Sequence, residues 1–168
     1  AVAARGRPAA VGDAARARMA ASASHLARCV AERRLVYGVT TGYGPLARHH
    51  VAPEHAATLQ RHLVYHLASG VGAPLSRTHT RALMAARLAS LARGHSGVGP
   101  AVVDLLLGCL TAGVTPVVPE RGTVGASGDL TPLAHVALVL IGEGRAEVGG
   151  RVLPGAEALA AAGLAPVA

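Results

Sequence analysis

The stretch Gly122-Thr-Val-Gly-Ala-Ser-Gly-Asp-Leu-Thr-Pro132 determines how the rest of the chain is interpreted. Glycine stands at its first, fourth and seventh positions, and only Ala126 and Ser127, both small, lie between the last two glycines. Because glycine has no Cβ, the backbone of such a segment can fold back tightly on itself. A backbone compressed in this way brings its own amide and carbonyl groups within reach of each other.

Three consecutive residues of this stretch have the chemistry to form an electrophile. If the amide nitrogen of Gly128 attacks the carbonyl carbon of Ala126, the backbone closes into a five-membered ring. Loss of the Ser127 hydroxyl then leaves an exocyclic methylidene, an electrophile that no unmodified side chain supplies. The ring therefore requires a residue without a side chain as the attacking group and a β-hydroxy residue between the two partners.

Two other interpretations of the glycine spacing remain open at this point. A Gly-x-x-Gly-x-x-Gly run is, by itself, more typical of a turn or of a loop that enters a helix. A phosphate-binding loop is the second alternative, because Asp129 can cap a following helix that has Pro132 in its first turn. The stretch lacks the Gly-Lys-Ser/Thr ending of a P-loop, however, and the spacing Gly-x-Gly-x-x-Gly is absent.

The longer segment Gly122-Thr-Val-Gly-Ala-Ser-Gly-Asp-Leu-Thr-Pro-Leu-Ala-His135 closely resembles the signature of the aromatic amino acid ammonia-lyases. This family comprises histidine, phenylalanine and tyrosine ammonia-lyases, in which Ala-Ser-Gly becomes the prosthetic group 4-methylideneimidazole-5-one (MIO). The resemblance implies that Ala126, Ser127 and Gly128 form MIO autocatalytically, without a metal. It runs from about Val2 to the last residue, and family members are much longer chains. Residues 1–168 are therefore expected to be the N-terminal, incomplete part of the MIO domain.

Composition and periodicity predict a mainly α fold with little β structure. Hydrophobic residues make up 51% of the chain, but Phe and Trp are absent, so Ala, Leu and Val must supply the packing. This composition favours closely packed helices over an aromatic-rich sheet. Apolar spacing predicts helices over residues 14–34, 53–69, 76–93, 100–112 and 130–142, and a short alanine-rich helix near the end. Residues 114–120 are expected to be extended and residues 144–153 to form a small hairpin. Together with the resemblance, this implies the N-terminal portion of the helical ammonia-lyase fold.

The glycine-rich segment Leu35-Val-Tyr-Gly-Val-Thr-Thr-Gly-Tyr-Gly-Pro45 interrupts the helical pattern and is expected to be a loop. From composition alone, Tyr37 and Tyr43 are packed aromatic residues whose hydroxyls form hydrogen bonds. The segment is similar to the lyases' Tyr-Gly-x-x-Thr-Gly-Phe/Tyr-Gly loop, which implies that Tyr37 is the catalytic base and that Gly44 lines the path of the substrate. A free phenol is a poor base near neutral pH unless its neighbours stabilise the anion.

The segment Leu59-Gln-Arg-His-Leu-Val-Tyr-His-Leu-Ala-Ser-Gly-Val-Gly72 resembles the selectivity segment of the lyases. A His-Leu pair at this point is similar to tyrosine-selective members, whereas Phe-Leu marks phenylalanine selectivity and Ser-His is typical of histidine ammonia-lyases. The resemblance implies that His66 hydrogen-bonds the phenolic hydroxyl of the substrate and that Leu67 packs against its ring. A buried imidazole so placed would be left unpaired by phenylalanine. Tyr65 departs from the pattern, since tyrosine-selective relatives often carry a second His there.

Several other features exclude or disfavour further classes of function. His62 and His66 have the i, i+4 spacing of two metal ligands, but no third ligand accompanies them. The net charge of +7 comes entirely from dispersed arginines without an aromatic stacking platform, which disfavours nucleic-acid binding. Cys29 and Cys109 are expected to be buried apolar residues. The most apolar stretch, residues 133–142, is too short to span a bilayer, and no secretory signal is recognised. A cytoplasmic location is the default expectation.

The resemblance implies non-oxidative deamination of an aromatic L-amino acid, with L-tyrosine converted to trans-p-coumarate and ammonia by a homotetramer. An aminomutase that uses the same prosthetic group, and a lyase acting on phenylalanine or histidine, are the alternatives within the family. The alternative from another class is a non-catalytic remnant of a lyase that self-associates through apolar helix faces.

Overall fold

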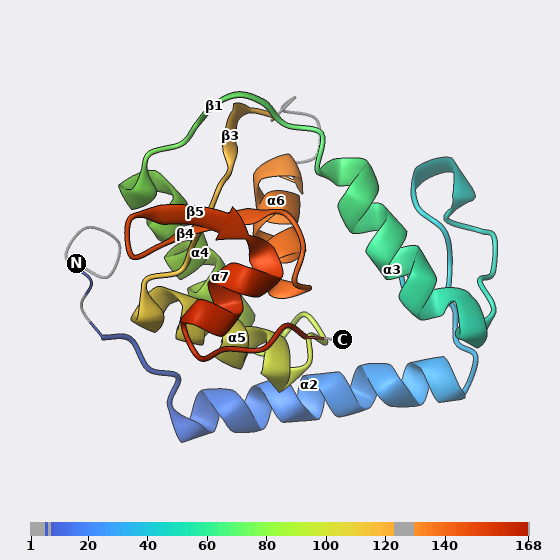
Figure 1. Ribbon diagram of the computed structural model, residues 1–168. Helices are drawn as coiled ribbons and strands as arrows, with labels where there is room; N and C mark the ends of the chain where they lie inside the picture. The colour runs from blue at the N-terminus through green and yellow to red at the C-terminus, as the bar shows by residue number, and fades with distance from the viewer. Residues whose placement is uncertain (1–5, 7, 123–129, 168) are drawn as a thin grey trace.

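The computed structural model describes residue 6 and residues 8–122 and 130–167. Within them the chain is mainly helical, as predicted, and the strands are short (Figure 1). The helices are α2 (Asp13–Ala31), α3 (Pro53–Leu67), α4 (Arg77–Leu91), α5 (Pro100–Ala112), α6 (Leu130–Leu140) and α7 (Gly155–Ala161), and a single 3₁₀ turn covers Gly44–Leu46. Helices α4, α5, α6 and α7 surround the core, whereas α2 packs against α5 and α3 packs against α6 at the margin.

The predicted helices are confirmed, with differences at their ends. Helix α5 has the predicted bounds, and Ser76 caps α4 by accepting a hydrogen bond from the backbone N–H of His79 (3.3 Å). Helix α2 ends three residues early, at Ala31. The reason is that Arg33 adopts a left-handed conformation (φ 54°), and Arg34 N–H donates back to the carbonyl of Cys29. This is the Schellman arrangement, which usually has a glycine at the left-handed position.

The strands form two small antiparallel sheets. The first pairs β1 (Val71–Pro74) with β3 (Pro119–Arg121). The second has the order β2-β4-β5, where β2 is Thr115–Pro116 and the hairpin of β4 (Arg145–Val148) and β5 (Arg151–Pro154) is the predicted one. Strand β1 was not predicted, because its sequence Val-Gly-Ala-Pro has no alternation of apolar and polar residues and all four residues are exposed.

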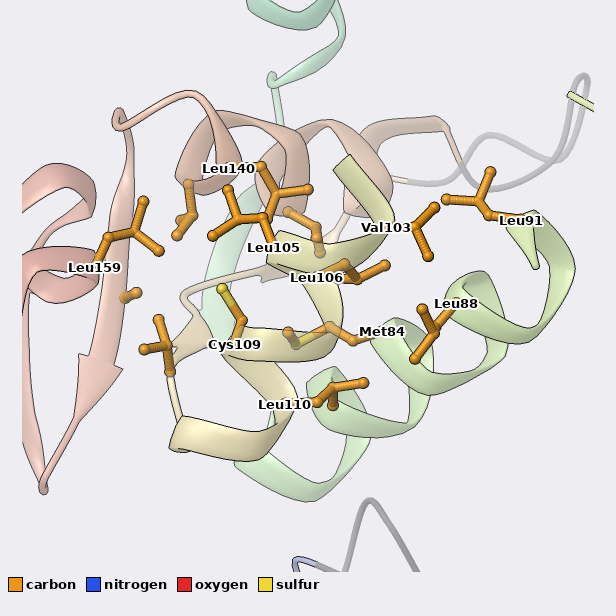
Figure 2. Packing of buried hydrophobic residues seen from close by; sticks show 14 of the residues in the cluster. Met84, Leu88, Leu91, Val103, Leu105, Leu106, Cys109, Leu110, Leu140 and Leu159 are labelled. Atoms are coloured by element: carbon orange, nitrogen blue, oxygen red, sulfur yellow. The ribbon is translucent and has the colours of Figure 1, made fainter. Parts of the chain in front are cut away.

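Most of the buried apolar side chains of the core come from four helices. Figure 2 shows Met84 and Leu88 of α4 facing Leu106, Cys109 and Leu110 of α5, with Leu140 and Leu159 completing the cluster from α6 and α7. Leu and Val therefore supply the packing that aromatic residues provide in many proteins, as the composition predicts. Cys29 and Cys109 are both buried free thiols, in agreement with the interpretation of them as apolar residues. Burial raises the pKa of Cys109 to about 12.

One charged residue, Arg81 of α4, lies inside this core with 2% of its surface exposed. Its Nη2 donates a hydrogen bond to the carbonyl of Leu110 in the last turn of α5 (2.9 Å). A cation near a helix C-terminus interacts favourably with the helix dipole, and the carbonyl is one of those that lack a partner within the helix. Arg81 therefore joins α4 to the end of α5.

No helix in the described part of the chain is long and apolar enough to cross a membrane.

Truncating Met84 tests the assignment of the core. Met84 is 0% exposed, so Met84→Ala is expected to lower the free energy of unfolding by about 2–5 kcal/mol, through lost burial and the cavity left behind. Leu35→Ala is the matched control, because Leu35 is 68% exposed and its truncation is expected to cost less than about 0.5 kcal/mol. Urea denaturation of both variants measures the difference, and equal costs would contradict the assignment.

Candidate functional site

The residues that flank the predicted prosthetic group lie against each other. Ala126, Ser127 and Gly128 are outside the described residues, but Gly122 and the first turn of α6 are within them. A Cβ built on Gly122 would lie 2.5 Å from Cγ2 and 3.0 Å from Cβ of Thr131, so only glycine fits there. The described residues on both sides of the Ala-Ser-Gly tripeptide are therefore in contact, which fits the close backbone approach that ring formation requires.

A second glycine, Gly70, meets the same point from the end of α3. A Cβ built on Gly122 would lie 3.5 Å from Cα of Gly70. The backbone N–H of Gly70 donates to Nε2 of His135 (3.3 Å). Burial lowers the pKa of His135, which favours the neutral imidazole that this hydrogen bond requires. We call Gly70, Gly122, Thr131 and His135 the glycine junction.

The pairing of β1 with β3 reinforces the glycine junction. Val71, which follows Gly70, pairs with Arg121, which precedes Gly122. Each glycine therefore adjoins a residue of the same antiparallel ladder. The consequence is that the last turn of α3, with His66 and Leu67, is held next to the described residues that flank the tripeptide.

His66 and Leu67 point to different surroundings. Leu67 is half-buried and lines an apolar cavity of about 270 Å³, whose wall also includes Leu63, Leu106, Leu130 and Leu133. His66 is exposed. The selectivity hypothesis assumed a buried imidazole, and the described residues do not supply that burial.

A polar network that the sequence did not predict joins α3 to Glu143, three residues after the end of α6. The Tyr65 hydroxyl donates to Oε1 of Glu143 (2.6 Å), and Arg61 donates to the same oxygen through Nη2 (2.9 Å) and to the Tyr65 hydroxyl through Nε (2.8 Å). The hydrogen bonds from Tyr65 and Arg61 lower the pKa of Glu143. Tyr65, the departure from the tyrosine-selective pattern, thus uses its hydroxyl within the protein. No local sequence signal could have shown a contact between residues so far apart in the chain.

Tyr37 and Gly44 lie together in the loop of residues 35–45, which was predicted to be irregular. The backbone N–H of Gly44 donates to the Tyr37 hydroxyl oxygen (3.1 Å), and the Tyr37 ring packs edge-on against Tyr43, with centroids 6.2 Å apart. Tyr37 is 63% exposed. The proposed base is therefore open to solvent, with one backbone donor on its oxygen.

A side-chain hydrogen bond attaches this loop to α3. Gln60 of α3 donates through Nε2 to the carbonyl of Gly38 (2.6 Å), and burial raises the pKa of Tyr43 beside it. In Figure 1 the loop lies alongside α3 while α6 packs on another side of that helix. Among the described residues, no hydrogen bond or ring contact joins Tyr37 to His66 or to the glycine junction.

Within the described ranges, no group of three or more His, Cys, Asp or Glu side chains could hold a metal ion. His62, one of the two histidines with ligand spacing, instead lies near the ring of Tyr65, with centroids 6.3 Å apart. The groups available for chemistry are thus the phenol of Tyr37, the exposed imidazole of His66 and the apolar cavity wall that includes Leu67.

Comparison with known proteins connects this arrangement to a family. The sequence model of the family described as "Aromatic amino acid lyase" matches residues 1–168. The chain is 51% identical over 166 residues to a histidine ammonia-lyase from Paracidovorax citrulli, covering 99% of this chain and 32% of that protein. Among solved structures, it resembles a phenylalanine aminomutase from Pantoea agglomerans (TM-score 0.93, 35% identity, covering 99% of this chain and 32% of that one). It also resembles a tyrosine aminomutase from Streptomyces globisporus (TM-score 0.92, 37% identity, covering 99% and 31%).

These matches confirm the predicted family and fold, because the helical arrangement described here is that of the corresponding part of the related structures. The chain spans about a third of the length of the relatives it matches. The family model extends over the whole sequence, and the identity to the relatives is well above the level at which only a fold is shared. The chain therefore belongs to the aromatic amino acid lyase family.

Proposed function

We propose that this chain is the N-terminal part of the MIO domain of a lyase that removes ammonia from an aromatic L-amino acid, with L-tyrosine converted to trans-p-coumarate. The observation that carries the proposal is the glycine junction. It places the last turn of α3, where the proposed substrate residues lie, beside the residues that flank the Ala-Ser-Gly tripeptide. Recognition of the substrate and the reacting group would thus be adjacent in space.

The prosthetic group is proposed to be MIO, formed by Ala126, Ser127 and Gly128. When formed, it supplies an electrophile for the amino group of the substrate. The described residues contribute a steric requirement, since Thr131 leaves no room for a side chain at Gly122. They also contribute the N-terminus of α6, which begins at Leu130 and whose partial positive charge favours negative charge nearby.

Tyr37 is proposed to remove a proton from the β-carbon of the substrate. The backbone N–H of Gly44 donates to its oxygen, and a donor in that position stabilises negative charge on the phenol oxygen. This contact gives Gly44 a role through its backbone, beside the substrate path that the family resemblance assigns to it. The exposure of Tyr37 leaves the oxygen accessible to a substrate.

His66 and Leu67 are proposed to recognise the aromatic ring. Leu67 belongs to the wall of the apolar cavity and offers an apolar surface, while the His66 imidazole is free to hydrogen-bond a phenolic hydroxyl. Because His66 is exposed in this chain, discrimination against phenylalanine requires that the substrate, or further chain packed over α3, exclude water from the imidazole. In the assembled homotetramer that we propose, other subunits are available to do so.

Histidine is the second candidate substrate, and one observation favours it. The relative with 51% identity is a histidine ammonia-lyase, although the His66-Leu67 pair differs from the Ser-His pair typical of such enzymes. An aminomutase is the second candidate reaction, because both of the solved structures compared above are aminomutases. Assays with L-tyrosine, L-phenylalanine and L-histidine, with separation of α,β-unsaturated acids from β-amino acids, distinguish all of these outcomes.

Changing Ser127 tests the origin of the electrophile. Fragment masses of the full-length protein are expected to show a deficit of two waters localised to Ala126, Ser127 and Gly128. Ser127→Ala cannot lose the hydroxyl, so the deficit is expected to shrink and ammonia release to fall to background. Thr123→Ala, which removes another hydroxyl from the same stretch, is the control. It is expected to keep the mass deficit and the release of ammonia. An unmodified wild-type mass would contradict the proposal.

Changing His66 tests the substrate assignment. His66→Phe is expected to shift the ratio of kcat/KM for tyrosine to that for phenylalanine by about 10- to 100-fold toward phenylalanine, the cost of one lost hydrogen bond to a desolvated hydroxyl. The control is His62→Phe, the same change one turn earlier on α3 at a site that is also exposed. An unchanged preference in His66→Phe would contradict the role of His66.

Changing Tyr37 tests the assignment of the base. Tyr37→Phe is expected to lower kcat by about 10²- to 10⁴-fold with little change in KM, because proton removal is lost while binding contacts remain. Tyr43→Phe removes the neighbouring, buried hydroxyl of the same loop and is expected to leave kcat within a few-fold of wild type. Steady-state ammonia release measures both, and equal losses would indicate a structural role for the loop.

A further inference from the structure

The position of the proposed substrate residues depends on how the end of α3 is held. Helix α3 packs against α6, and the chain leaves it through Gly70 into the exposed strand β1. His66 and Leu67 lie in the last turn before this exit. Any movement of Gly70 relative to α6 would therefore move both side chains relative to Gly122 and Thr131.

His135 is the side chain that meets Gly70 from α6. It lies in the second turn of α6, half-buried, on the same helix whose Thr131 packs against Gly122. Its Nε2 accepts the hydrogen bond from the backbone N–H of Gly70. Gly70 is the third residue after the end of α3. Neutral imidazole with its proton on Nδ1 is the form that can accept this bond.

Packing around Gly70 makes this contact restrictive. A Cβ on Gly70 would lie 3.0 Å from Nε2 of His135 and 3.1 Å from Cβ of Pro119 in β3. The imidazole and the proline ring thus form a slot that a glycine fills. The hydrogen bond orients the Gly70 backbone relative to His135, and the packing against His135 and Pro119 sets how closely this backbone approaches α6. Together they fix the position of the chain where it leaves α3.

We propose that His135 is a positioning residue for substrate recognition, which fixes the last turn of α3, and with it His66 and Leu67, against the start of α6 by accepting the Gly70 N–H. The inference rests on the function proposed above. His135 acts through Gly70, so its loss should weaken binding of the substrate more than it slows the chemical step.

The test compares full-length wild type with His135→Leu and His135→Gln. In His135→Leu, hydrogen exchange of the peptide spanning residues 67–72 is expected to accelerate about three- to tenfold, because the acceptor is gone. KM for the amino acid substrate is expected to rise by a similar factor while kcat stays within about twofold. His135→Gln retains an acceptor oxygen and is expected to recover part of both effects.

The matched control is His79→Leu, the same change at an exposed histidine in the first turn of α4. It is expected to alter neither exchange at residues 67–72 nor KM. If His135→Leu leaves both quantities at the control value, the positioning role is wrong. If His135→Leu does not fold, Gly70→Ala decides, because its Cβ would lie 3.0 Å from Nε2 of His135 and would displace the imidazole by a few tenths of an ångström. An unchanged KM in Gly70→Ala would overturn the proposal.

Failure of this inference is distinguishable from failure of the proposed function. If the wild-type protein releases no ammonia from any aromatic amino acid, the proposed function fails, whatever the exchange data show. If the wild type is active and exchange accelerates in His135→Leu without a change in KM, the function stands. His135 then merely stabilises the end of α3, and the positioning role is overturned.

Discussion

The close approach of Gly70 and Gly122 at the first turns of α6 is the constraint on which the rest of the site depends. Thr131 leaves no room for a Cβ at Gly122, and a Cβ at Gly70 would press tightly on His135 and Pro119. The end of α3 and the chain that leads into the Ala-Ser-Gly tripeptide are thereby brought to the same place. Pairing of Val71 with Arg121 extends the contact into a short ladder. A few backbone atoms thus connect the proposed recognition residues with the proposed reacting group.

Helix α6 can hold this junction because its other face is anchored in the core. Val136, Val139 and Leu140 are buried among the aliphatic side chains of α5 and α7, while Thr131 and His135 face the two glycines. Burial of apolar surface supplies the free energy that holds α6 in place, and the polar contacts at the glycine junction orient the backbone of Gly70. The absence of Phe and Trp is no obstacle, since closely spaced helices pack well with Leu, Val and Ala.

Similarity to the family and the proposed substrate recognition involve different parts of the chain. Similarity to the histidine ammonia-lyase and to the two aminomutases extends over nearly the whole sequence, and so it reflects the packing that all of these proteins share. The residues proposed to recognise the substrate, by contrast, are only two side chains, the exposed His66 and the half-buried Leu67. A chain can therefore resemble one enzyme overall and another at the residues proposed to recognise the substrate.

The sequence by itself determined the family and the helices, and it indicated which residues are candidates for the chemistry. It did so because helix periodicity, capping by Ser76, the β4–β5 hairpin and the tripeptide signature are encoded by neighbouring residues. It placed the end of α2 too late, because an arginine at a left-handed position gives no local signal. Only the tertiary structure decided that Gly70 meets His135, that Tyr65 and Arg61 share Glu143, and that His66 is exposed. These contacts join residues 65 to 82 positions apart, and their energies depend on how α3 packs on α6, which no short stretch of sequence encodes.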